Sequence, residues 1–376
     1  MRILFLGTHG QYNIGDELLL ETFLAQLGVK NRYAVNSYDP EFTAGMMRPR
    51  FDIETFHTTR QLPRFLKHLL SSDLLVFGGG SIIKELYASV GRNRYATLRM
   101  ILATVAFAKR VARKKVVMSN IGVGPITTPG GERYARAILN NVDFLSVRDD
   151  KSHSTCLKLG LPQSKVRRVP DAVFANTGDV LLTRPIVLPN TGRLKLALNL
   201  NYDIENRDAW EAFVQNLAGA LIALNARTPI DIHALPMQSR FKANDDLSVL
   251  TAFRERVADI PMTLHNPQTA QEAAAIIAAC DVALAERLHT LVISSILGKP
   301  FYGLIYDVKV KELIGYLGML DHSTNINEPF AAESLCAGVA TVIDQRDAIG
   351  ARLKKRSGEL RAELDAYFGE LRTHYL

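Results

Sequence analysis

Short apolar runs alternate with helix-like stretches along the first half of the chain. The run RILFLG at 2–7 has the length of a buried strand, and a glycine-rich loop separates it from the helix-like DELLLETFLAQLG at 16–28. Further strand patterns lie at 72–80, 115–125 and 142–149, and further helix patterns at 97–114, 130–141 and 150–160. Wholly apolar strands that alternate with helices are typical of a parallel sheet covered on both faces.

The alternation stops between 175 and 193, where prolines, glycines and asparagines accumulate, and then resumes. Strand patterns follow at 194–201, 229–237, 281–286 and 299–306, and helix patterns at 209–224, 247–257, 270–280 and 288–297. We therefore predict an α/β protein of two Rossmann-like domains that face a cleft. The predicted domains are 1–178 and 190–345, and a C-terminal helix at 346–376 follows them.

The helix pattern at 288–297 is apolar on nearly every side, as in a buried helix, and Gly298 and Pro300 predict its end. Its N-terminal end carries Arg287 and His289. Because partial positive charge gathers at a helix N-terminus, cations are disfavoured there and anions are favoured. The two basic side chains therefore predict that an anion binds beside them.

Composition places the chain among globular proteins. Of its 376 residues, 47% are hydrophobic and 22% charged, and we find no apolar run of the length, about 18 residues, that a membrane-spanning helix needs. The apolar run at the N-terminus is too short for a signal peptide. Three widely spaced cysteines cannot all pair, which predicts a reducing, cytoplasmic location.

The formal net charge of +7 raises the question of an anionic partner. The densest basic clusters, at 112–116 and 352–356, are not interleaved with aromatic side chains, so we predict no nucleic-acid partner. A small acidic substrate explains the charge equally well. Peripheral contact with an anionic membrane surface is a further alternative that the charge leaves open.

The loop GTHGQYNIGDE at 7–17 follows the first predicted strand. Its glycines do not have the spacing of a dinucleotide fingerprint, and Asp16 and Glu17 stand where a phosphate-binding loop needs lysine and a hydroxyl. We therefore exclude nucleotide hydrolysis. Asp16 fits a helix cap at least as well as a contact with substrate hydroxyls.

A second glycine loop follows the strand pattern at 72–80. It comprises Gly78, Gly79, Gly80 and Ser81. Glycines let the backbone approach a ligand closely, and ligands bind such sheets beyond the carboxyl ends of the strands. We predict ligand contact here; a tight turn with unusual dihedral angles is the alternative.

Two further cations follow strand patterns, Arg148 after 142–147 and Lys309 after 299–306. Taken alone, Arg148 is typical of a surface ion pair, but a guanidinium at the end of a strand is also suited to holding a carboxylate or phosphate. We expect no metal site, because His153 and Cys156 share a helix face without a second ligand pair. No G-x-S-x-G sequence supports a hydrolase triad.

The motifs resemble, in their order, those of the polysaccharide pyruvyltransferase family. They are GQYNIGDELLLETF, DLLVFGGGSIIKE, NIGVGPI, DFLSVRDDKSHSTCLKLGL, VPDAVFA, AERLHTLVISSILGKPF and GLIYDVKVKEL. The resemblance implies a two-domain glycosyltransferase-B fold, with the acceptor on the first domain and the donor on the second. It also implies an enzyme that transfers the pyruvyl group of phosphoenolpyruvate, as a ketal, to a sugar of a cell-surface polysaccharide or its precursor.

Site residues follow from the resemblance where the motifs match. Arg148, Arg287 and Lys309 would bind phosphoenolpyruvate, which would be a co-substrate, and no other cofactor is implied. His289 would protonate the enol carbon or assist departure of phosphate, and Asp16 or His9 would deprotonate an acceptor hydroxyl. The acceptor sugar, its attachment to a lipid and the oligomeric state are left open.

The chain departs from the family pattern at two places. Glu286 replaces a residue that is usually uncharged, which puts a negative charge beside the predicted anion, and Lys84 and Glu85 stand where glutamine and aspartate are common. The alternative is a glycosyltransferase of the same fold with a nucleotide-sugar donor. A pair of glutamates eight residues apart would favour it, but Ser294 follows Glu286 at that distance. A non-catalytic binding protein of this fold is a third alternative.

Overall fold

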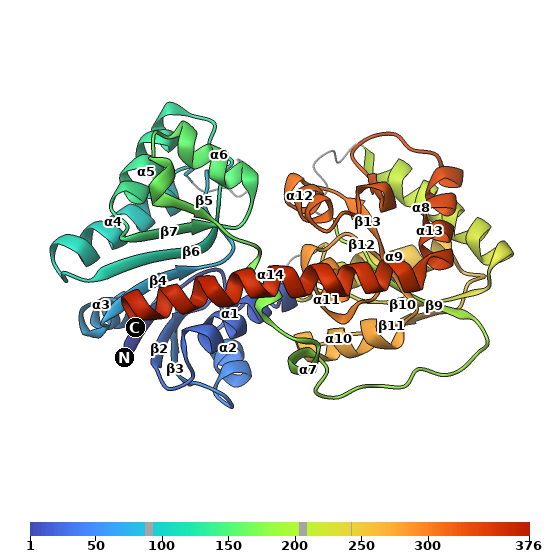
Figure 1. The fold of residues 1–376 in the computed structure, drawn as a ribbon, viewed down its shortest axis with the longest axis horizontal. Helices are drawn as coiled ribbons and strands as arrows, with labels where there is room; N and C mark the ends of the chain where they lie inside the picture. The colour runs from blue at the N-terminus through green and yellow to red at the C-terminus, as the bar shows by residue number, and fades with distance from the viewer. Residues whose placement is uncertain (87–92, 203–208, 242) are drawn as a thin grey trace. The chain divides into compact units, whose positions relative to one another are not determined.

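The computed structural model describes residues 1–86, 93–202, 209–241 and 243–376. The chain forms two compact units (Figure 1). Unit 1 consists of Met1–Gln11, Asp16–Ala172 and Ala362–Leu376, and unit 2 of Tyr12–Gly15 and Val173–Arg361.

Unit 1 is built on a parallel sheet with the strand order β3-β2-β1-β4-β6-β7-β8, and β5 pairs with β6 beside this path. The strands are β1 (Arg2–Leu6), β2 (Arg32–Asn36), β3 (Asp52–Phe56), β4 (Leu74–Gly78), β5 (Ser81–Ile83), β6 (Lys115–Val123), β7 (Phe144–Val147) and β8 (Val166–Arg168). The central strand β4 is buried along its whole length, as expected of a sheet with helices on both faces.

Three helices of unit 1 begin at a side chain that supplies a capping oxygen. Asp39, Thr128 and Asp149 each accept a backbone N–H of the helix that follows. The helices are α1 (Ile14–Leu27), α2 (Pro40–Met47), α3 (Leu62–Ser71), α4 (Ala96–Arg110), α5 (Pro129–Asn140), α6 (Asp150–Lys158) and the last part of α14 (Arg346–Tyr375). The hydroxyl of Tyr367 on α14 lies 2.5 Å from Ser119 Oγ and 2.7 Å from Ser146 Oγ. These contacts tie the end of the chain to unit 1.

Unit 2 has the strand order β11-β10-β9-β12-β13-β14, all parallel. The strands are β9 (Leu194–Asn199), β10 (Ile230–Ala234), β11 (Met262–Leu264), β12 (Val282–Ala285), β13 (Phe301–Ile305) and β14 (Ser323–Asn325). Numbered within the unit this is the order 3-2-1-4-5-6 of a doubly wound sheet, whose direction of winding changes between β9 and β12. The carboxyl ends of these two strands are where such sheets bind ligands.

The helices of unit 2 are α7 (Gly178–Leu181), α8 (Trp210–Arg227), α9 (Asp246–Arg256), α10 (Ala270–Ala279), α11 (Leu288–Leu297), α12 (Val308–Tyr316), α13 (Ala332–Asp344) and the first part of α14. The predicted buried helix is α11, and it ends at Gly298 in the left-handed conformation with φ 66°. Among the described residues, no helix is both long and apolar enough to cross a membrane.

The predicted α/β class with two Rossmann-like units is confirmed. The units differ from the predicted domain ranges at three places. Residues 173–178 belong to unit 2, where α7 contacts α10, and residues 362–376 belong to unit 1 through contacts such as those of Tyr367. Residues 12–15 leave the first unit for the second. Local composition marks a break in the chain, but these assignments depend on partners far away in the sequence.

Candidate functional site

Polar side chains gather in unit 2 where β9 and β12 end. Asn199 and Asn201 come at the end of β9, and Glu286 and Arg287 directly follow β12. The winding of the sheet changes between these two strands, so the residues lie at the position where a doubly wound sheet binds its ligand. The sequence predicted Arg287 here, but not the two asparagines.

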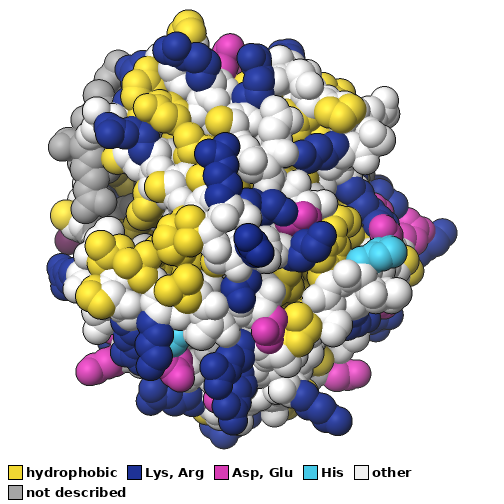
Figure 2. Space-filling model, turned by 90° about the vertical axis from the view of Figure 1, so that its left-hand side faces the viewer, with side chains coloured by type: hydrophobic (Ala, Val, Ile, Leu, Met, Phe, Trp, Pro, Cys, Tyr) yellow, Lys and Arg dark blue, Asp and Glu magenta, His cyan; other side chains and the backbone are white. Residues whose placement is uncertain are grey.

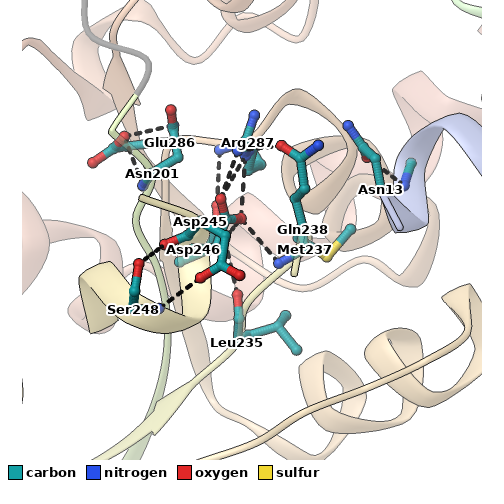
Figure 3. A network of polar contacts seen from close by, with 12 residues as sticks. Asn13, Asn201, Leu235, Met237, Gln238, Asp245, Asp246, Ser248, Glu286 and Arg287 are labelled. Carbon is teal, nitrogen blue, oxygen red and sulfur yellow. Dashed lines mark hydrogen bonds and ion pairs between the residues drawn. The ribbon is translucent and has the colours of Figure 1, made fainter. Parts of the chain in front are cut away.

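Arg287 is engaged in a buried ion pair (Figure 3). Its Nη2 lies 2.5 Å from Oδ1 of Asp246, and its Nε lies 3.2 and 3.1 Å from the two carboxylate oxygens. Nη2 also lies 3.2 Å from the side-chain oxygen of Gln238. Asp246 is fully buried and the Arg287 side chain is 13% exposed. The anion that the sequence predicted beside Arg287 is therefore supplied, at least in part, by the protein itself.

The two asparagines connect the end of β9 to the residues that follow β12. Asn199 accepts the backbone N–H of Arg287 at 2.9 Å and donates to the carbonyl of Leu235 at 2.8 Å. Asn201 donates its side-chain N–H (2.6 Å) and its backbone N–H (3.1 Å) to Oε2 of the fully buried Glu286. The departure of Glu286 from the family pattern is thus accommodated by a hydrogen-bonding partner of the same unit. Asparagines at the end of an otherwise apolar strand were the available sequence signal.

His289 is half-buried in the first turn of α11, and its ring lies against Gly15. A Cβ atom on Gly15 would stand 1.9 Å from the Nδ1 of His289, so only glycine fits there without a shift. The segment that carries Gly15 is fixed to unit 2 by its backbone. The N–H of Ile14 donates to the carbonyl of Met237 at 2.9 Å, and Asn13 forms an isolated antiparallel β-bridge with Gln238. The first motif and the motif at 287–289 therefore meet within unit 2.

Lys309 lies in the first turn of α12, which follows β13, the neighbour of β12 in the sheet. Its Nζ is 3.2 Å from Asp307, and its side chain is 41% exposed. Asp307 also caps α12 by accepting the N–H of Val310 at 2.9 Å. Lys309 thus presents an accessible cation on the same sheet edge as His289.

Arg148 belongs to unit 1 and directly follows β7. Its side chain is 8% exposed, with Nη1 3.3 Å from Asp171 and Nε 3.9 Å from Asp149. Taken alone, Arg148 was expected to form an ion pair at the surface. It does form an ion pair, but the pair is buried. Each of the three predicted cations has a carboxylate partner in its own unit, and Lys309 is much the most exposed of them.

The first loop of unit 1 contains two buried titratable groups near Asp16. Burial lowers the pKa of His9 to about 3, and burial raises the pKa of Glu17 to about 8. Glu17 accepts the N–H of Gly10 at 2.5 Å, and its other oxygen has no hydrogen-bonding partner in the described structure. At neutral pH both side chains are therefore mainly uncharged. Asp16, in the first turn of α1 beside Glu17, is half-buried, and Glu17 was not predicted as a site residue.

The glycine loop after β4 is dictated by packing. Gly79 and Gly80 have φ 62° and 71°, and a Cβ on Gly78 would stand 2.1 Å from the ring of Phe5. A Cβ on Gly79 would be equally close to Leu19. These backbone angles and close contacts explain why three glycines form the tight turn. Ligand contact by Gly78, Gly79, Gly80 and Ser81 stays a prediction.

Glu85, the other departure from the family pattern, has a structural role. It accepts hydrogen bonds from the hydroxyls of Thr127 at 2.7 Å and Thr128 at 2.5 Å, beside the start of α5. Burial acts to raise the pKa of Glu85, but these hydrogen bonds outweigh it and lower the pKa. The described residues hold no group of three or more histidine, cysteine or acidic side chains arranged to bind a metal.

Comparison with solved structures defines the class of protein. Anabaena HepE in complex with UDP-glucose is similar over 99% of both chains, with 14% identity and a TM-score of 0.66. UDP-GlcNAc 2-epimerase from Neisseria meningitidis, bound to UDP-GlcNAc, matches over 98% of this chain and 99% of its own, with 11% identity and a TM-score of 0.63. A glycosyltransferase from Rickettsia africae matches over 99% of this chain and 98% of its own, also with 11% identity and a TM-score of 0.63. The fold is glycosyltransferase-B-like, as predicted.

The family is shown by sequence. The profile of the polysaccharide pyruvyl transferase family matches residues 13–308. The chain belongs to this family, which confirms the resemblance inferred from its motifs, and it is a transferase of polysaccharide biosynthesis. The matched range includes Arg148, Arg287 and His289 and ends one residue before Lys309.

Proposed function

We propose that the protein transfers the pyruvyl group of phosphoenolpyruvate to two hydroxyls of one sugar in a cell-surface polysaccharide or its precursor, forming a ketal. The observation that carries the proposal is the packing of His289 against Gly15 at the ligand-binding edge of unit 2, with Lys309 on the neighbouring strand end. Two family motifs far apart in the sequence thereby meet at His289, the side chain that we propose transfers a proton.

Lys309 is the proposed anchor for the phosphate or carboxylate of the donor, because it is accessible and its partner Asp307 is shared with the cap of α12. Arg287 is a positioning residue in this account, because its guanidinium is held by Asp246 and fixes the start of α11. Arg148, in unit 1, stays a proposed anion-binding residue, and an anion bound there would compete with Asp171 for its guanidinium.

The reaction balances without a redox cofactor. The methylene carbon of phosphoenolpyruvate gains a proton and becomes the methyl group, and the oxygen of the first sugar hydroxyl bonds to the central carbon while its proton passes to a base. The second hydroxyl then displaces phosphate from the same carbon, and its proton leaves with the phosphate or with a base. His289 is the proposed donor of the first proton.

On the acceptor side we propose that Asp16 deprotonates a sugar hydroxyl. His9 is the weaker candidate, because its side chain is buried and therefore less accessible to an acceptor than the half-buried Asp16. The glycine loop Gly78–Ser81 would contact the acceptor through its backbone.

A transferase with a nucleotide-sugar donor is the second candidate. It is favoured by the likeness to solved structures that contain UDP or UDP-sugars, such as those of HepE. In that case a diphosphate would occupy the edge of unit 2 near α11, and His289 would not be required to protonate a carbon atom.

The experiment is a transfer assay in deuterated water with phosphoenolpyruvate and saccharide fractions, soluble and lipid-linked, from the cell that makes the protein. The expected result is release of inorganic phosphate together with a product methyl group that carries one deuterium. His289→Ala should lower this turnover by about 10²–10⁴-fold, as is typical of general acid–base groups. Sugar transfer from UDP-glucose without phosphoenolpyruvate consumption would overturn the proposal.

A further inference from the structure

Helix α3 of unit 1 presents a row of leucines to solvent. Leu62, Leu66 and Leu70 are 53%, 37% and 52% exposed and are spaced four residues apart, so they lie along one side of the helix. Phe65 and Leu69 are buried and hold the helix on the unit. The exposed row is therefore not needed to attach α3 to its own sheet.

Cations surround the N-terminal end of this row. A cavity of about 800 Å³ at the ends of β2 and β3 is lined by Arg48, Arg60 and Arg64, together with His57. Arg64 lies 3.6 Å from Glu54, while Arg48 and Arg60 have exposed side chains. Two acidic groups also line the cavity. Asp39 caps α2, and Glu41 is exposed in the first turn of that helix.

A second basic cavity lies at the other end of α3. It has a volume of about 440 Å³ and is lined by Met1, Arg2, Lys30, Arg32, Ser71 and Asp73. The one acidic lining residue, Asp73, accepts the backbone N–H of Arg2 at 2.8 Å, and Arg32 pairs with Asp52 at 3.0 Å. Ser71 is the last residue of α3, so the leucine row runs from one basic cavity to the other.

Figure 2 shows the side of the molecule that lies at the left of Figure 1, where α3 and both chain ends are drawn. Hydrophobic side chains form patches there among many lysines and arginines, with few acidic side chains between them. A helix with an apolar row, flanked by cations, is suited to lie in the interface of an anionic bilayer. There leucines enter the acyl boundary and each cation near the lipid phosphates adds about 1 kcal/mol.

We propose that α3 docks unit 1 on a membrane that contains anionic lipids. Leu62, Leu66 and Leu70 insert at the level of the headgroups, and the two basic cavities receive lipid phosphates. The inference goes beyond the proposed function and does not depend on the donor. It places the enzyme where a saccharide acceptor carried by a lipid would be presented.

The first test is sedimentation of the full chain with vesicles. The protein should bind an equimolar mixture of phosphatidylcholine and phosphatidylglycerol, less strongly at high salt, and should not bind phosphatidylcholine alone. Lys67 is a further exposed cation on α3. Replacing both Arg60 and Lys67 by glutamate should weaken binding about 20-fold or more, since each lost cation is worth about fivefold. Lys355→Glu, an exposed lysine of α14 in unit 2, is the matched control and should change little.

The second test locates the contact. The three native cysteines are buried, so an environment-sensitive fluorophore can be attached selectively to Leu70→Cys. Its emission should shift to the blue when anionic vesicles are added, whereas the same label at Ile222→Cys, 51% exposed on α8, should not respond. Absence of vesicle binding overturns the proposal. So does binding in which the label at position 70 stays in water, because another surface would then be the docking face.

Discussion

Arg287 and Asp246 form an ion pair inside unit 2, with Nη2 of Arg287 2.5 Å from Oδ1 of Asp246. Asp246 begins α9 and also accepts the N–H of Met237 at 3.0 Å, while Arg287 is the residue from which α11 starts. The pair therefore joins two helices at the edge where the sheet changes its winding. An arginine that the sequence assigned to a substrate anion is held first by an anion of its own unit.

Arg287→Ala should destabilise the protein by about 3 to 5 kcal/mol, because it leaves the carboxylate of Asp246 buried without its cation. The measurement is urea unfolding at neutral pH. Arg254→Ala, which removes an exposed arginine of α9, is the matched control and should change the free energy of unfolding by less than about 0.5 kcal/mol. Unchanged stability of Arg287→Ala, with phosphoenolpyruvate binding lost, would instead make Arg287 a direct ligand-binding residue.

Gly15→Ala should lower turnover towards that of His289→Ala while the protein stays folded. The added methyl group would stand 1.9 Å from the imidazole, so the ring must move away from its position. Phosphate release from phosphoenolpyruvate in the presence of acceptor measures the effect. Gly45→Ala in α2 is the control, since nothing lies within 4 Å of its added Cβ. Full activity of Gly15→Ala would show that the imidazole position does not matter.

Lys309→Ala should raise the KM for phosphoenolpyruvate with a smaller effect on kcat, because the lost cation binds the donor in both ground and transition states. Its side chain is partly exposed, so the melting temperature should change little. Lys311→Ala, an exposed lysine on the same helix, should leave both constants unchanged. Equal effects of the two substitutions would argue for a general electrostatic contribution in place of a specific contact.

Glu17 and His9 predict how stability depends on pH. The pKa of Glu17 rises from 4.5 to about 8 on folding, so the native state holds a proton that the unfolded state releases, and stability falls as pH rises through this interval. The pKa of His9 falls from 6.5 to about 3, so stability is lost as pH falls through that interval. Where the intervals overlap, between 4.5 and 6.5, the two effects oppose each other.

Glu17→Gln tests the alkaline part of this dependence. The amide resembles the protonated acid, so the variant should lose less stability than the natural protein between pH 6.5 and 8 when melting is followed by circular dichroism. The loss of stability at acid pH, which depends on His9, should be the same in the variant and in the natural protein. Parallel melting curves of the two proteins across the alkaline range would mean that Glu17 is ionised in the folded state.

Much of the fold followed from the sequence, because wholly apolar strands and the buried helix α11 leave strong local patterns. The region 29–71 was not assigned, although it contributes β2, α2, β3 and α3. Strands such as Asp52–Phe56 carry charged residues on exposed positions, and α3 is short and has leucines on its solvent side. These elements are stabilised mainly by their neighbours in the sheet, and their own hydrophobic periodicity is weak.

The positions of the candidate residues in the fold could be predicted in part. The motifs placed His289 and Lys309 at strand ends, and the topology puts these ends on one edge. The partners of Arg287 could not be foreseen, because Asp246 lies 41 residues away and Asn199 lies 88 away. The contact of Gly15 with His289 is likewise a property of the folded chain, since glycine in a loop has many local explanations.

The measurement that tests the central claim most directly is thermal unfolding of the purified protein with phosphoenolpyruvate and, separately, with UDP-glucose. A ligand that binds only the folded state stabilises it by about 2.7 kcal/mol at 100 times its Kd, which is enough to raise the melting temperature detectably. We predict that phosphoenolpyruvate raises it and that Lys309→Ala removes most of the shift at the same concentration. A shift with UDP-glucose and none with phosphoenolpyruvate would contradict the proposed donor and the role of His289 with it.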